Sequence, residues 1–101
     1  MTENEDVKKM NYWEPKAGGS IEGIIQASAS SGLIYDERKT LWVQQDKGAA
    51  IGIILNRYLI HSLKQHSADV GDFIVVTFHG KEQKNNGRYF NRYSLILDKI
   101  A

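Results

Sequence analysis

Basic and aromatic side chains are interleaved near the C-terminal end of this 101-residue chain. Residues 81–92 contain four basic side chains and one acidic side chain, Glu82, so four positive charges and one negative charge leave a net +3. Tyr89 and Phe90 lie within the same stretch. Cations neutralise phosphates and aromatic rings stack on bases, so this composition predicts a nucleic-acid-binding surface. The formal net charge of the whole chain is only +1, so the positive charge is local.

Two strand-like runs, residues 73–79 and 89–97, flank this basic stretch and predict a β-hairpin. Asn86-Gly87 lies between them, and both residues tolerate the positive φ that tight hairpin turns require. The predicted loop spans residues 80–87 and would carry the basic side chains at its tip. The start of the first run is apolar on both faces, which predicts a homodimer contact or a covering segment.

Trp42 is the second candidate for contact with a base. It alternates with Leu41 and Val43, so it is predicted on the opposite, polar face of a strand. A tryptophan in that position is a platform on which a base can stack. The alternative is that the Tyr12-Trp13 segment covers it, and Trp13 itself is predicted to close one end of the core.

The remaining chain predicts a small β-barrel. The predicted strands span residues 20–28, 39–45, 49–55, 73–79 and 89–97. A helix over residues 57–65, with Asn56 as its N-cap, separates the third and fourth strands. This order predicts an all-β protein with a small helical content, a five-stranded OB-fold Greek-key barrel with one helix between strands 3 and 4. Residues 13–101 form the domain, after a flexible N-terminal arm of residues 1–12.

In an OB-fold, strands 2 and 3 and the 1–2 and 4–5 loops bind oligonucleotides. The residues expected at this surface are Tyr35, Lys39, Trp42, Lys81, Lys84, Arg88, Tyr89, Phe90 and Arg92. Arg38 would extend the basic track. About four phosphate contacts to a single strand predict that log K falls with log salt with a slope near −3.

Five short runs carry a family resemblance: Trp13-Glu14-Pro15, Gly19-Ser20-Ile21-Glu22-Gly23-Ile24, Val70-Gly71-Asp72-Phe73-Ile74-Val75-Val76, Gly80-Lys81 and Gly87-Arg88-Tyr89-Phe90-Asn91-Arg92-Tyr93. They resemble the small OB-fold single-stranded-DNA-binding proteins of phages and mobile elements. The resemblance implies binding of single-stranded DNA without sequence specificity, in replication or recombination, inside the host cytoplasm. RNA is the alternative nucleic acid, because the sequence does not indicate whether a 2′-hydroxyl is read.

Other classes of function find less support. The chain has no cysteine, which fits a reducing cytoplasm, and no apolar run as long as a membrane span. His61, His66 and His79 do not have the spacing of metal ligands, and no catalytic motif is present, so no enzyme, metal or cofactor is expected. The alternative function is an OB-fold protein-interaction module, such as a replisome or phage assembly component, that does not bind nucleic acid directly.

Overall fold

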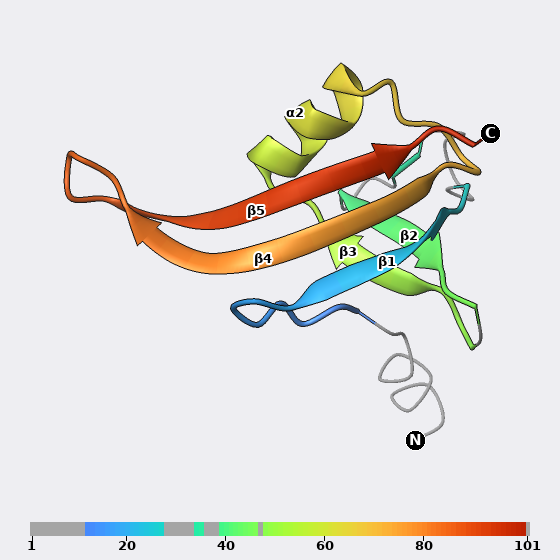
Figure 1. The fold of residues 1–101 in the computed structure, drawn as a ribbon, viewed down its shortest axis with the longest axis horizontal. Coiled ribbons are helices and arrows are strands. Elements are labelled where there is room, and N and C mark those ends of the chain that lie inside the picture. The colour runs from blue at the N-terminus through green and yellow to red at the C-terminus, as the bar shows by residue number, and fades with distance from the viewer. Residues whose placement is uncertain (1–11, 28–33, 36–38, 47, 101) are drawn as a thin grey trace.

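The computed structural model describes residues 12–27, 34–35, 39–46 and 48–100 (Figure 1). The predicted N-terminal arm, apart from Tyr12, lies outside the described residues, and so does Arg38.

The described chain forms one five-stranded antiparallel sheet and one helix, which confirms the predicted all-β class. The elements are β1 Ser20–Ile25, β2 Thr40–Gln44, β3 Ile51–Ile54, α2 Arg57–Gln65, β4 Phe73–Gln83 and β5 Tyr89–Asp98. The strand order is β3-β2-β1-β4-β5, and every ladder is antiparallel. The helix falls between β3 and β4 at the predicted residues.

The strand β1 joins the two halves of the sheet. Ile24 and Ile25 pair with β2, whereas residues 20–24 pair with β4. The buried Gly23 lies next to Ile24, the residue that pairs with both strands, and a Cβ at Gly23 would stand 2.7 Å from the carbonyl oxygen of Gln44. Only glycine allows so close an approach of two backbones, so this residue permits one strand to serve both halves.

The core lies between the inner faces of the sheet and α2. Leu41 and Val43 are fully buried, as their alternation with Trp42 predicts. The helix contributes Leu59 and Leu63, and its N-cap, Asn56, accepts a hydrogen bond from the backbone N–H of Leu59 at 2.8 Å. The predicted helix, its cap and its apolar face are therefore confirmed.

A seam separates β3 and β5, the outer strands of the order, and no ladder joins them in the described residues. The backbone N–H of Trp13 donates to the carbonyl oxygen of Gly52 in β3 at 2.8 Å. Its indole packs edge-on against Tyr93 of β5, with 6.4 Å between ring centroids, and Tyr93 in turn contacts Phe78 at 4.9 Å. Trp13 is thus partly buried and packs against the core between β3 and β5, in agreement with its predicted contact with the core.

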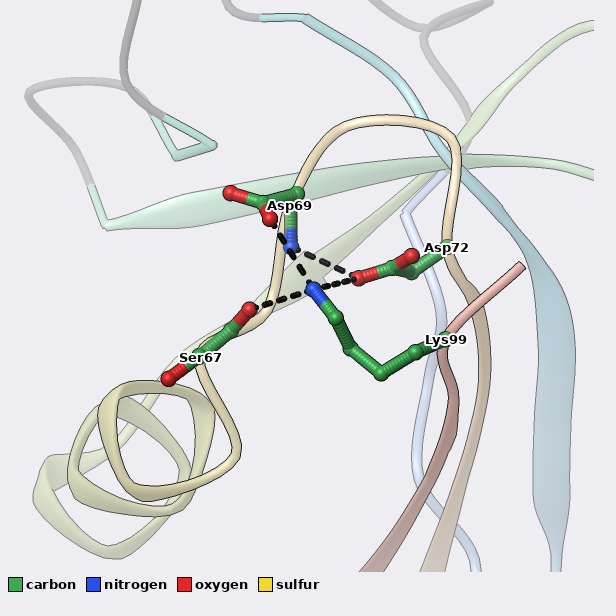
Figure 2. Close-up of polar contacts among 4 residues, drawn as sticks. All are labelled: Ser67, Asp69, Asp72 and Lys99. Carbon is green, nitrogen blue, oxygen red and sulfur yellow. Dashed lines mark hydrogen bonds and ion pairs between the residues drawn. The ribbon is translucent and has the colours of Figure 1, made fainter. Parts of the chain in front are cut away.

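A buried carboxylate ties the end of β5 to the turn that follows the helix (Figure 2). The Asp72 side chain is fully buried and accepts hydrogen bonds from the Lys99 ammonium at 2.8 Å and from the backbone N–H of Asp69 at 2.9 Å. Lys99 also donates to the Asp69 carboxylate and to the carbonyl oxygen of Ser67. Hydrogen bonds to Asp72, then to Asp69, raise the pKa of Lys99 above its ordinary value.

Within the described ranges, no helix is both long enough and apolar enough to cross a bilayer.

Candidate nucleic-acid interface

The β4–β5 hairpin extends beyond the rest of the sheet (Figure 1). β4 pairs with β1 only over residues 73–77, and the backbone of Phe78 bonds to Gly18 and Gly19 just before β1. Beyond Phe78, β5 is the only strand that pairs with β4 in the described residues. The turn at its tip has a hydrogen bond from the Gly87 N–H to the Lys84 carbonyl oxygen at 2.9 Å. Gly87 has a φ of 85°, whereas Asn86 keeps a negative φ and accepts a hydrogen bond from the Arg88 N–H through its side chain. The predicted turn at Asn86-Gly87 is confirmed, with positive φ needed at the glycine alone.

The predicted end of the first hairpin strand was wrong. The strand continues through Gln83, so Lys81 lies on β4 and not in the loop. A register shift between Phe78 and Gly80 inserts His79 as an extra residue, and the ladder resumes beyond it. Such a bulge bends a strand without ending it, and Gly80, a glycine inside the strand with a φ of 102°, marks its position in the sequence.

The two faces of the hairpin carry different predicted site residues. Alternation along β5 places Tyr89 and Asn91 on the face that continues the core side of the sheet, and Phe90 and Arg92 on the outer face. Lys81 pairs with Asn91 and so shares the face of Tyr89. Tyr89 is 68% exposed, which leaves its ring open to a partner.

Charge on the outer face of the hairpin is partly neutralised. The Arg92 guanidinium donates to the Glu82 carboxylate at 2.6 Å, and both side chains are about half exposed. The Lys84 ammonium lies 5.2 Å from the centroid of the Phe90 ring, a cation–π geometry. The hairpin therefore presents Lys81, Lys84 and Arg88 as cations, while Arg92 is shared with Glu82.

Trp42 lies on the outer face of β2 and is half-buried. Its six-membered ring lies over Gly52, where an added Cβ would stand 3.1 Å from two of its atoms. Tyr12 forms a parallel bridge with Gly52, and its ring lies 5.4 Å from that of Trp42, tilted by 51°. Tyr12 flanks the indole and is itself 37% exposed. The two rings form a continuous aromatic surface on the outside of β2 and β3, which we call the Tyr12–Trp42 surface.

Tyr35 and Lys39 are not on this surface. Tyr35 pairs with Leu41, so it shares the core side of β2, opposite to Trp42, and packs against the core. The Lys39 ammonium lies 5.5 Å from the centroid of the Tyr35 ring. The structure therefore brings these two residues together, but apart from the other predicted residues.

Two candidate residues were missed at the sequence level. Tyr12 and Lys16 line a groove together with Trp13, Glu14 and Ile51. The sequence indicates that Tyr12 and Trp13 point to opposite sides. The proline at position 15 favours an extended chain before it, and neighbouring side chains of an extended chain point in opposite directions. Trp13 therefore enters the seam while Tyr12 remains outside. Their sequence position does not reveal which strand edge receives them.

No protein-family model, no curated protein and no solved structure matches this chain.

Proposed function

We propose that this protein is a non-enzymatic binder of single-stranded nucleic acid with little sequence preference. One observation carries the proposal: a two-stranded hairpin projects beyond the sheet and carries three cations, Lys81, Lys84 and Arg88, and an exposed aromatic ring, Tyr89, on the face of Lys81. Phosphates are attracted by such cations, and any base can stack on an exposed aromatic ring. The resemblance to phage single-stranded-DNA-binding proteins favours DNA over RNA.

The Tyr12–Trp42 surface supplies the second contact with bases. It is aromatic and partly exposed, and it lies on strands 2 and 3, the surface that OB-folds use for oligonucleotides. A strand that stacks there and continues to the hairpin would meet Lys16 in the groove beside Trp13. Both surfaces then serve one ligand.

Titration with oligo-dT, followed by tryptophan fluorescence at low and high salt, tests this proposal. We expect saturable quenching that high salt reverses. The Trp42→Phe variant is the matched control, since it keeps an aromatic ring for stacking but removes the reporter on the surface. It should bind with similar affinity, measured by anisotropy of a labelled oligonucleotide, while the quenching is largely lost. If neither the wild type nor the Trp42→Phe variant binds oligo-dT at low salt, the proposal is refuted. A parallel titration with oligo-U distinguishes binding of RNA from binding of DNA.

A second candidate function, protein interaction, is favoured by a different surface. Ile96 is 66% exposed on the outer face of β5, and its ladder partner Val75 and the nearby Phe73 are only half-buried. An apolar patch on a sheet face is typical of a contact with protein, here most simply the homodimer predicted from the sequence. Sedimentation of the wild type and of Ile96→Ser, without nucleic acid, tests it: a dimer that the substitution dissociates would support this role.

A further inference from the structure

A groove follows the free edge of β5, the strand that pairs only with β4 among the described residues. Helix α2 packs beside this strand (Figure 1) and contributes Tyr58 from its first turn. The groove is lined by Tyr58, His79, Phe90, Asn91, Arg92, Tyr93 and Ser94. Six of these side chains, all except Phe90, can donate hydrogen bonds, and no carboxylate is among the described residues that line the groove.

His79 and Ser94 form a hydrogen-bonded pair in this groove, with 2.9 Å between Nε2 and Oγ. The pair keeps one donor for a ligand in either tautomer of the neutral imidazole. If Nε2 accepts the hydroxyl proton, Nδ1 carries the N–H; if Nε2 donates, the Ser94 hydroxyl proton is free to turn outwards. The pair is thus suited to an acceptor-rich ligand.

Positive charge in the groove comes from Arg92 and from the helix. The hydrogen bond to Glu82 uses one nitrogen of the Arg92 guanidinium, and the other N–H groups of Arg92 can bind an oxyanion. The first turn of α2 contains Arg57 and Tyr58 and no acidic residue, so the positive end of the helix dipole is not neutralised locally. The Glu82 carboxylate reduces the electrostatic attraction between Arg92 and an anion, but it also fixes the position of the guanidinium.

Aromatic rings connect this groove with the surfaces already described. Tyr93 lines the groove and contacts Trp13, and Trp13 lines the neighbouring groove with Tyr12 and Lys16. The walls of the two grooves therefore touch at the Trp13–Tyr93 contact, in the seam between β3 and β5.

We propose that the groove along β5 binds a phosphodiester of the bound single strand, held by Tyr58, Ser94 with His79, and Arg92. The inference rests on the proposed function and adds Tyr58, His79 and Ser94 to the predicted residues Phe90 and Arg92 that line this groove. A phosphodiester matches the groove, because it accepts hydrogen bonds and carries a negative charge. The base that follows it in the strand can stack on Phe90.

The test compares the affinity of oligo-dT for the wild type and for the double variant Tyr58→Phe/Ser94→Ala, at fixed low salt. Each substitution removes one hydroxyl and keeps the rest of the side chain, and neither residue lies in the core cluster. We expect the dissociation constant to rise about tenfold or more, since hydrogen bonds to a charged group are among the stronger ones. Ser20→Ala is the matched control: its hydroxyl bonds to Thr77, outside the groove.

A second measurement follows the imidazole signals of His79 and of His61, which is exposed on α2, during the same titration by NMR. We expect the signals of His79 to move and those of His61 to stay. Wild-type affinity in the double variant, with weakened binding in Trp42→Ala, would overturn the inference and leave the proposed function standing. No binding by the wild type would overturn both.

Discussion

Neutralising Glu82 should strengthen binding. In the free protein this carboxylate accepts a hydrogen bond from Arg92 at 2.6 Å, so the pair presents no net charge to a phosphate. The substitution Glu82→Gln keeps the length of the side chain and removes its charge. Because both partners are about half exposed, the pair contributes only about 0.2–1 kcal/mol to stability, and the fold should survive.

The size of the gain follows from counter-ion release. One additional cation available to a single strand steepens the slope of log K against log salt by about 0.7. The hairpin then offers four cations in place of three, so the slope from these contacts changes from about −2 to about −3. Between roughly 1 M and 0.1 M salt, a difference of about 0.7 corresponds to about fivefold tighter binding. The two proteins should bind alike near 1 M.

Dissociation constants for oligo-dT over a series of salt concentrations measure this slope. The matched control is Glu22→Gln, which changes the net charge of the chain by the same amount at an exposed site on β1. An unchanged slope in the Glu82 variant would refute the reasoning. An equal gain in both variants would show that overall charge matters and that the contact with Arg92 does not.

Four further outcomes are expected. Trp42→Ala should weaken binding of oligo-dT by about 1–3 kcal/mol in titrations, while circular dichroism shows an intact fold. Gly23→Ala should lower the free energy of unfolding by about 1–3 kcal/mol in urea melts, because its Cβ would stand 2.7 Å from a backbone oxygen; an unchanged midpoint would contradict this. Asp72→Ala should lower the free energy of unfolding by about 1–3 kcal/mol, because the backbone N–H of Asp69 loses its hydrogen-bond acceptor. The affinity of the folded variant for an oligonucleotide should be unchanged. The pKa of Lys99 is raised by hydrogen bonds and that of Tyr93 by burial, so the folded state holds both protons more tightly than the unfolded chain. The stability that these two groups contribute should be constant below a pH of about 10 and fall above it, less steeply in Lys99→Met.

Local patterns were sufficient for much of the architecture. Alternation placed Leu41 and Val43 in the core with Trp42 outside, because successive residues of a strand point to opposite faces whatever the rest of the fold does. The helix start at Asn56 and the turn at Gly87 likewise depend on backbone and side-chain chemistry within a few residues. The class of the fold followed from the order of these elements.

Tertiary structure decided how the candidate site is assembled. β4 continues past its predicted end through the bulge at His79. Tyr12 contacts Trp42, and Tyr58 lies beside the edge of β5, although both pairs are far apart in the sequence. The sequence shows Glu82 as one negative charge among four positive ones. It does not show which of the four cations forms the ion pair with Glu82. These features depend on which strand edges and side chains meet in space, and strand periodicity alone carries no information about contacts between distant segments.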